Sequence, residues 1–551
     1  MQPLKHRLAV ALGMGVLMVS LGLSQGSGKF RSDDPLQVDP DQLPIPPPEP
    51  VRLSQIFDFL KSTYSNRPDD KTPIPPAENV NTLGEVPDSS WFTNRMSRRV
   101  MTLEELVRGP NQVDGPDQSK PWVIIAVKSE GITPGFTIRD ARDDVYFIKF
   151  DPPKYPQLAT STEVIVTKFF YAFGYHVPEN FLSRIRRDHL QISPEARLED
   201  SEGKERAVND GDIDRIFKMA YQLPDGTTPV VASRLLEGIP MGPFTYDGTR
   251  SDDPNDIFPH QHRRELRGMR VFAAWLNHDD SRSINSLDMY LGSPGEGHLG
   301  HYLIDFGSTL GSGSIKPQSP RAGNEYIIEA APIVKAGLTL GIWDRPWRHV
   351  KYPDYPAIGR FEGDFFQPQL WKSEYPNPAF ERMQLEDAFW ATRIVLRFTD
   401  EMIRAIVDTG QISDPQASDY LVETLIKRRD KIIRYYLPQM NPLDEFRFTG
   451  EPGLSLRLAF KNLGLEAGLA VASSYRYQWF RFDNASQGME PVTEIRPSTE
   501  SSLDVPQDPA AYLMVRITTS SQEQPQWRKK VEVFIRNDSQ KPTVVGIQRE
   551  P

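Results

Sequence analysis

The stretch from Arg263 to Gly307 constrains the fold of this chain more than any other part of the sequence. Apolar residues recur with helical spacing over 263–277 and predict a helix with a buried face. Two apolar segments, 287–291 and 301–304, flank a turn rich in glycine and proline, so we expect them to form a hairpin. A polar loop therefore lies between the helix and the hairpin, and the chain returns to that loop at Asp305.

The loop and the end of the hairpin carry the residue types that phosphoryl transfer needs. That reaction uses a carboxylate to orient the acceptor hydroxyl, oxygen ligands for Mg²⁺, and a cation on the phosphates. Asp280 and Asn285 are five positions apart in the loop, so both side chains can point to one place. The hairpin returns Asp305 beside them, where its carboxylate can join magnesium to the phosphates.

Strand patterns precede this region. Runs of apolar and β-branched residues predict strands over 123–127, 136–138, 145–150 and 230–236. A helix is expected from Thr162 to Phe173, ended by Gly174. Strict alternation along 145–150 places Lys149 on a strand face, while Glu163 lies on the helix that follows.

These residues resemble the signatures of the protein kinases. His278-Asp279-Asp280 followed by Asn285 resembles the catalytic loop His-Arg-Asp-x-x-x-x-Asn. Asp305-Phe306-Gly307 is identical to the metal-binding tripeptide of that family. Lys149 and Glu163 resemble its phosphate-binding lysine and the partner of that lysine, in the same order along the chain.

The match covers about residues 122–439, with Arg234-Leu235-Leu236-Glu237-Gly238 where a hinge between two lobes would come. No Gly-x-Gly-x-x-Gly loop is present, and Gly131 and Gly135 offer a loose substitute. No Ala-Pro-Glu segment follows Gly307, so the chain is more similar to atypical kinases such as the HipA, CotH and phosphatidylinositol kinase groups.

The resemblance implies magnesium-dependent transfer of the ATP γ-phosphate to a hydroxyl acceptor, which can be a protein, lipid, sugar or small molecule. Asp280 would be the base, and Lys149, oriented by Glu163, would hold the phosphates. The magnesium ligands would be Asn285 and Asp305. Nucleotide-binding contacts would come from Lys149, Gly131, Gly135 and Glu237.

Each residue also has a purely structural interpretation. Thr160-x-x-Glu163 fits a helix capping box, Lys149 could be a solvated strand residue, and Asp305 could belong to a common turn. His278 is expected to be a buried histidine that orients the loop. The functional interpretation rests on the order and spacing that these residues share with the kinase signatures.

The N-terminus predicts export. Lys5-His6-Arg7 precedes an apolar run from Leu8 to Leu23, and small residues follow up to Gly28. The chain has no cysteine, which fits an oxidising compartment and excludes thiolate chemistry. We expect a periplasmic or secreted protein, with residues 1–28 either cleaved as a signal peptide or kept as a membrane tether.

The expected fold is α+β, a two-lobed kinase-like domain with a C-terminal β-sandwich-like domain. Its predicted parts are a proline-rich arm and docking segment (29–120), a β-rich small lobe (121–240), a helical large lobe (241–441) and a β-domain (442–551). Within these, long helices are expected over 385–408 and 418–436, and a short one near 53–64. We interpret the proline-rich residues 30–76 as a tether or an arm.

The formal net charge of −10 argues against a general nucleic-acid binder. Basic runs such as Lys427-Arg428-Arg429 are interpreted as solvated helix faces.

Three other functions stay open. The first is a pseudokinase scaffold that keeps the fold without the chemistry. The second is a metal-dependent hydrolase, whose candidate ligands would be His260, His262, His278, Asp279, Asp280, His298 and His301. The third is a cell-envelope protein whose terminal domain binds glycan or protein. Tyr475, Tyr477 and Trp479 share one strand face there and could stack on sugars, although such a stripe is more often part of a core.

Overall fold

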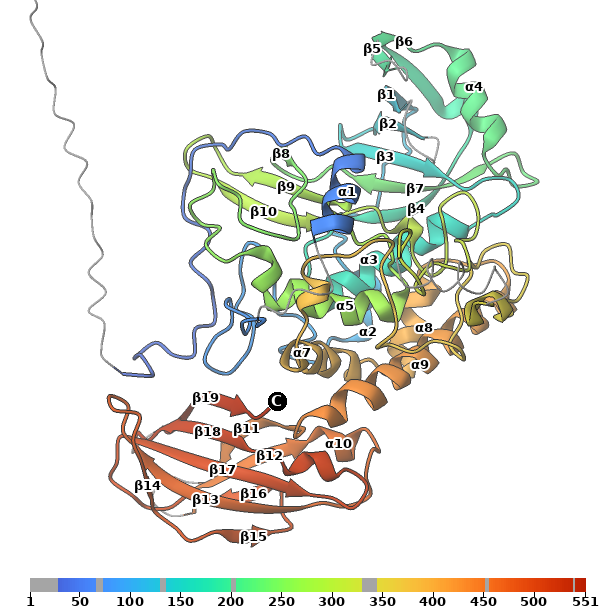
Figure 1. Cartoon of the computed structure of the whole chain (residues 1–551). Helices are drawn as coiled ribbons and strands as arrows, with labels where there is room; N and C mark the ends of the chain where they lie inside the picture. Colours follow the sequence, from blue (N-terminus) through green and yellow to red (C-terminus); the bar gives the residue numbers. More distant parts are fainter. Residues whose placement is uncertain are drawn as a thin grey trace, which may run out of the picture.

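The computed structural model describes residues 28–65, 73–128, 135–199, 205–329, 344–450, 455–538 and 541–551. It is a mixed α+β structure with several sheets (Figure 1). A large sheet lies at one end, helices fill the middle, and a second β-rich part lies at the other end. Within the described residues, no helix has the length and apolar character that crossing a membrane requires. The predicted leader, apart from Gly28, lies outside the described residues.

The seven-stranded sheet at the upper right of Figure 1 carries Lys149. Its strands are β1 (Trp122–Lys128), β2 (Gly135–Arg139), β3 (Val145–Phe150), β4 (Asn180–Ile185), β5 (Leu190–Glu199), β6 (Glu205–Ala207) and β7 (Thr228–Arg234). Their order is β4-β7-β3-β2-β1-β5-β6, and only β1 and β5 pair in parallel. Alternation in β3 turns Tyr146, Ile148 and Phe150 towards α4 (Asp210–Met219), while Lys149 faces α3 (Leu158–Phe173).

The strands predicted in this part are all present, with ends that differ by two residues or fewer. The segment from Leu190 to Met219 adds β5, β6 and α4, which the sequence pattern did not predict. Pro194 and several charged residues interrupt the alternation of β5, and its pairing with β1 contains a register shift.

A large hydrophobic core lies among the helices in the middle of Figure 1. These helices are α2 (Leu103–Arg108), α5 (Arg264–Leu276), α7 (Leu385–Leu396), α8 (Asp400–Asp408) and α9 (Pro415–Tyr436). Helix α3 contributes its apolar side chains to the same core. Single 3₁₀ turns occur at Arg187–His189, His260–His262, Ser283–Asn285, Phe306–Ser308, Pro346–His349, Phe380–Arg382, Leu437–Gln439 and Pro525–Arg528.

The single long helix predicted over 385–408 is wrong. Two helices, α7 and α8, occupy this stretch because Thr399 starts a new one. Its hydroxyl accepts a hydrogen bond from the backbone N–H of Met402, and two acidic residues fill the first turn of α8.

The predicted hairpin forms part of a three-stranded sheet beside the helices. Its strands are β8 (Ile239–Gly242), β9 (Ser286–Leu291) and β10 (His298–Leu303), in the order β10-β9-β8. Asn285 immediately precedes β9 and Asp305 follows β10, so the hairpin joins two of the candidate residues.

Two antiparallel sheets form the lower part of Figure 1 and share one core. They comprise β11 (Leu443–Thr449), β12 (Arg457–Asn462) and β16 (Ser502–Asp504) in one, and β13 (Ser474–Phe482), β14 (Met489–Pro491), β15 (Arg496–Ser498), β17 (Tyr512–Ser520), β18 (Val531–Arg536) and β19 (Thr543–Arg549) in the other. The short helix α10 (Leu463–Glu466) follows β12. Tyr475, Tyr477 and Trp479 are buried in the shared core, as expected for such an aromatic stripe, and so do not form a sugar-stacking surface.

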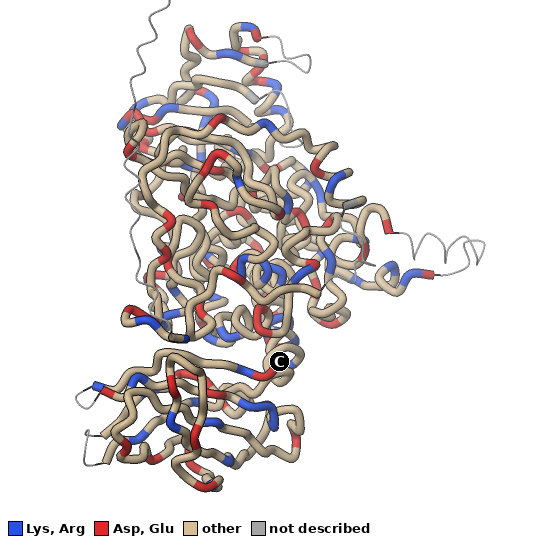
Figure 2. Tube along the Cα trace, turned by 60° about the vertical axis from the view of Figure 1, so that its left-hand side comes forward, with Lys and Arg blue, Asp and Glu red and all other residues tan. Residues whose placement is uncertain are grey.

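Of the two alternatives, tether or arm, the described residues form an arm that packs against the rest of the protein. Phe30 is buried against Phe482, Tyr512 and Phe534 of the C-terminal sheet. Further along, the hydroxyl of Tyr375 donates a 2.6 Å hydrogen bond to Asp58 of α1 (Gln55–Ser65), and Trp91 and Phe92 belong to the main core. Widely spaced apolar side chains therefore fasten a proline-rich chain to the body of the protein. Lys, Arg, Asp and Glu are interspersed along the whole trace (Figure 2).

Replacing Phe30 with alanine should loosen the start of the arm, where it contacts the C-terminal sheet. The substitution removes a buried ring, and we expect the free energy of unfolding to fall by about 3 kcal/mol, the lower end for Phe→Ala. Urea unfolding measures the change, and limited proteolysis should show faster cleavage near residue 30. Leu36→Ala, at an exposed position of the same arm, should change stability by less than about 0.5 kcal/mol. Equal effects of the two variants would contradict the assigned burial.

Candidate functional site

Three segments of the chain, β3, α3 and the end of the β9–β10 hairpin, meet at the carboxylate of Glu163. Its Oε2 lies 3.1 Å from Nζ of Lys149, and its Oε1 accepts a 3.0 Å hydrogen bond from the backbone N–H of Phe306. Nζ of Lys149 also lies 2.9 Å from Oδ1 of Asp305. The side chain of Glu163 is 2% exposed, whereas that of Asp305 is 49% exposed, so the cluster opens to solvent at Asp305.

The two carboxylates keep Lys149 charged. Burial tends to lower the pKa of this lysine, but Asp305 and Glu163 together raise its pKa above the usual value. Removing one partner of a buried ion pair costs about 3 to 5 kcal/mol, because the other charge stays buried without compensation. Lys149 is therefore a fixed cation at the mouth of the cluster, which suits the binding of phosphate.

Asp151 determines where α3 begins. Its carboxylate accepts hydrogen bonds from three backbone N–H groups at the start of the helix and from the hydroxyl of Thr160. The helix begins at Leu158, four residues earlier than predicted, and Thr160 lies inside it. The predicted capping box of Thr160 and Glu163 is therefore wrong, and the carboxylate of Glu163 serves the ion pair instead.

The end of α5, where the candidate catalytic loop begins, is held by side chains from other parts of the chain. Asn277 ends the helix in the left-handed conformation, with φ 52°, and its side chain accepts a 2.9 Å hydrogen bond from Nε1 of Trp371. Arg428 on α9 donates to the carbonyl oxygens of Ala274 and Trp275, at 2.5 and 2.8 Å. Arg428 is buried, so the expectation that its basic run is a solvated face is wrong at this position.

Asp280 belongs to an ion-pair network in this loop. Arg282 pairs with Asp280, and its NH1 lies 3.0 Å from Oε2 of Glu374. Burial raises the pKa of Asp280 to about 7, against the lowering effect of Arg282, and Glu374 adds to the rise. Burial and Asp280 also raise the pKa of the adjacent Asp279 well above its usual value. A carboxyl group with a pKa near neutrality suits general acid–base catalysis.

His278 supports the loop, as expected for a buried histidine. Its Nδ1 lies 3.0 Å from the hydroxyl of Thr309, and its ring packs against Phe170 and Phe306. Burial lowers the pKa of His278 to about 4, so the ring is neutral at physiological pH.

Asn285 and Asp305 lie at the two ends of the hairpin, where Asn285 pairs with the residue before Asp305. The backbone N–H of Ile304 donates a 3.0 Å hydrogen bond to the carbonyl oxygen of Asn285. Nδ2 of Asn285 donates to the backbone oxygen of Asp280 at 2.8 Å, so the side-chain oxygen is the atom suited to bind a metal. Asp305 adopts a left-handed backbone, with φ 62° and ψ 66°, which is uncommon outside glycine.

The side-chain oxygens of Asn285 and Asp305 are of the ligand type that suits magnesium. Mg²⁺ prefers oxygen ligands, and proteins commonly hold it with one or two carboxylates plus phosphate and water oxygens. Over the part of the chain that the structure describes, no group of three or more His, Cys, Asp or Glu side chains is arranged to hold a metal ion. Asn285 and Asp305 would thus need nucleotide phosphates to complete the coordination.

The remaining predicted nucleotide contacts have different environments. Gly135 begins β2 opposite Lys149, where a Cβ would lie only 2.4 Å from the backbone oxygen of Ile148. Close strand packing alone therefore requires glycine there. Glu237 is exposed after β7, and its charge adds to burial in raising the pKa of Tyr302 on β10. Gly131 lies outside the described residues.

The histidines considered for a metal-dependent hydrolase do not converge on one point. His260, His262 and His301 each pair with a different carboxylate, at 2.7, 2.8 and 2.7 Å. Because these side chains are already paired separately, the geometry gives the hydrolase hypothesis no support.

Sequence reasoning missed three residues of this site. Arg282 is only two positions from Asp280, and its place in the loop was the one available signal. Glu374 and Arg428 lie far along the chain and reach the loop through the fold.

The chain was compared with known proteins. It matches no protein-family model, and no significant match exists among the curated proteins or the solved structures.

Asp280→Asn tests the pKa of this carboxyl group. Its pKa rises from 3.8 to about 7 on folding, so the folded protein binds the proton more tightly than the unfolded chain. The stabilisation is full below about pH 4 and is lost as the pH rises to about 7. We expect the free energy of unfolding of the wild type, relative to Asp280→Asn, to fall by about 2 to 4 kcal/mol over this range. Urea unfolding at several pH values measures it, and a constant difference would contradict the assignment.

Asp354→Asn provides the matched control, because Asp354 is exposed and lies outside the loop. The difference between this variant and the wild type should stay constant over the same pH range.

Proposed function

We propose that the protein is an atypical kinase-like phosphotransferase that moves the γ-phosphate of ATP to a hydroxyl acceptor. The observation that carries the proposal is the convergence of Lys149, Glu163 and Asp305, from three separate segments, on one ion-pair cluster. The kinase resemblance of the sequence predicts that these three residues act together at one site. The hydrogen bond from Asn285 to the backbone oxygen of Asp280 supports the proposal further, because the proposed metal ligand contacts the residue proposed as the base.

Each residue has a defined part in the proposed reaction. Lys149, held by Glu163, binds the phosphates, and Asp280 accepts the proton of the acceptor hydroxyl. The hydroxyl oxygen then bonds to the γ-phosphorus as the bond to ADP breaks. Asn285 and Asp305 would hold Mg²⁺, which when bound neutralises charge on the phosphates. Arg282 and Glu374 set the charge of Asp280 before substrate binds.

The proposal extends to the architecture and location of the protein. The sheet with α3 would be the small lobe, and α5 with α7–α9 the large lobe, with residues 234–238 between them as a hinge. The leader-like N-terminus supports an exported, periplasmic or secreted enzyme, either free or tethered to the membrane. The acceptor would be a protein, lipid, sugar or small molecule.

Ligand-dependent stability separates metal binding from chemistry. ATP with Mg²⁺ at about a hundred times its dissociation constant should stabilise the wild type by roughly 2.7 kcal/mol, seen as a higher unfolding midpoint. Asp305→Asn should lose the magnesium-dependent shift because it removes a metal ligand. Asp280→Asn should keep the shift but lose transfer of labelled γ-phosphate to protein or water.

Glu494→Gln, an exposed change in the C-terminal sheets, should behave as the wild type in both assays. An unshifted wild type would refute nucleotide binding. A normal shift without transfer would instead favour the pseudokinase scaffold.

A further inference from the structure

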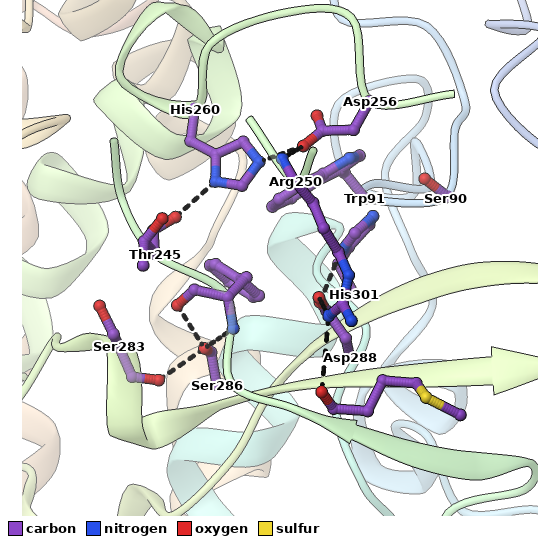
Figure 3. Close-up of polar contacts among 12 residues, drawn as sticks. Ser90, Trp91, Thr245, Arg250, Asp256, His260, Ser283, Ser286, Asp288 and His301 are labelled. Carbon is purple, nitrogen blue, oxygen red and sulfur yellow. Dashed lines mark hydrogen bonds and ion pairs between the residues drawn. The ribbon is translucent and has the colours of Figure 1, made fainter. Parts of the chain in front are cut away.

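We propose that Trp91 is a positioning residue for the metal site, because it anchors the β9–β10 hairpin whose ends are Asn285 and Asp305. The proposal rests on the proposed function of those two residues. It gives the N-terminal arm, defined as the described residues between 28 and 92, a direct part in the active site. The contacts lie in one buried polar cluster (Figure 3).

Trp91 is enclosed on both faces. Its ring stacks on His301 of β10 with a centroid distance of 3.6 Å and an interplanar angle of 16°. The guanidinium of Arg263 lies 4.5 Å from the Trp91 ring centroid, and the ring of His260 meets Trp91 edge-on at 4.6 Å. The backbone N–H of His301 also donates a 3.0 Å hydrogen bond to the carbonyl oxygen of Ser90. Trp91 thus holds β10 through both its ring and its backbone neighbour.

A buried polar contact between His301 and Asp288 connects β10 to β9. Nδ1 of His301 lies 2.7 Å from Oδ1 of Asp288, its partner across the two strands. Oδ2 of Asp288 lies 3.1 Å from NH1 of Arg250, and Arg250 donates to the backbone oxygen of Glu49 in the arm. In Figure 3, Arg250, Asp288 and His301 form one chain of contacts beside Trp91. Both strands of the hairpin are therefore fixed at this point.

The arm also holds the hairpin elsewhere. At its tip, the backbone N–H of Ile45 donates to the oxygen of Gly297 at 2.8 Å, and the hydroxyl of Tyr290 donates to the oxygen of Ile45 at 2.7 Å. At the outer strand β8, the backbone N–H of Val51 donates to the oxygen of Met241 at 2.8 Å. The tip, the middle and the neighbouring strand are each fastened by a separate part of the arm.

Fastening the hairpin matters because the metal site tolerates little movement. Mg²⁺ requires oxygen atoms at about 2.0–2.1 Å in near-octahedral geometry. A slip of one residue in a strand moves the chain by about 3.4 Å and turns each side chain to the other face. Since His301 lies four residues before Asp305, its anchorage limits such movement at Asp305.

The test measures magnesium dependence in the full-length chain. Trp91→Ala should raise the half-saturating Mg²⁺ concentration for ATP binding by about tenfold, the lower end for changes outside the ligands themselves. Trp91→Phe keeps an aromatic face and should raise it by only about threefold. Calorimetric titration of Mg²⁺ at fixed ATP gives both values, at a temperature where circular dichroism shows the fold intact. Should Trp91→Ala fail to fold, the intermediate value of Trp91→Phe decides.

Phe30→Ala is the matched control, because it removes a buried aromatic side chain from the same arm without touching the hairpin. It should leave the magnesium dependence unchanged. If Trp91→Ala and Trp91→Phe bind magnesium and ATP as the wild type does, or if Phe30→Ala shifts the dependence equally, positioning by Trp91 is refuted.

Amide hydrogen exchange distinguishes a failure of the proposed function from a failure of the anchoring role of Trp91. Trp91→Ala should speed exchange over residues 286–303 while leaving α5 unchanged, and this readout does not require nucleotide. A wild type without magnesium-dependent ATP binding overturns the proposed function. Unchanged exchange in the hairpin overturns the anchoring role of Trp91 on its own.

Discussion

The buried carboxylate of Glu163 is the contact on which the candidate site depends. A lone carboxylate at that depth would be strongly destabilising, so the fold must bring a cation and a hydrogen-bond donor to it. Lys149 supplies the charge from β3, and the backbone of Phe306 supplies the donor from the end of the hairpin. One side chain thus ties together a helix, a sheet and the segment that carries Asp305. Moving any of these elements would leave a charge without compensation.

Around this contact, helix ends are completed by side chains from elsewhere in the chain. Asp151 satisfies the start of α3, and Arg428 satisfies the end of α5. Both caps lie next to candidate residues, Glu163 and the loop of Asp280. Backbone groups at helix ends need such partners when water is excluded. Asp151 and Arg428 therefore contribute both to the stability of the helices and to the geometry of the candidate site.

Local patterns in the sequence predicted most strands and helices. A strand or helix that buries one face has apolar residues at a regular spacing, and this spacing can be read from the sequence. Alternation in β3 is the clearest case, and it correctly separated Lys149 from the buried face of Tyr146, Ile148 and Phe150. The break before α8 could have been predicted only from the N-cap role of Thr399. Strand β5 was not predicted because Pro194 and several charged residues interrupt its alternation. Residues such as Glu374 reach the site only through tertiary contacts, which no local period records.

The burial of Phe30 has a consequence for the order in which the protein can assemble. Its ring packs on Phe534 of β18 and against Gly546 of β19, where a Cβ would lie 2.5 Å from the ring. Phe30 is therefore made about five hundred residues before the partners that bury it. Until β18 and β19 have been synthesised, its ring lacks these partners, so the nascent chain exposes Phe30 to chaperones and proteases. Packing of the two strands would bury the ring and fix the start of the arm at the same time.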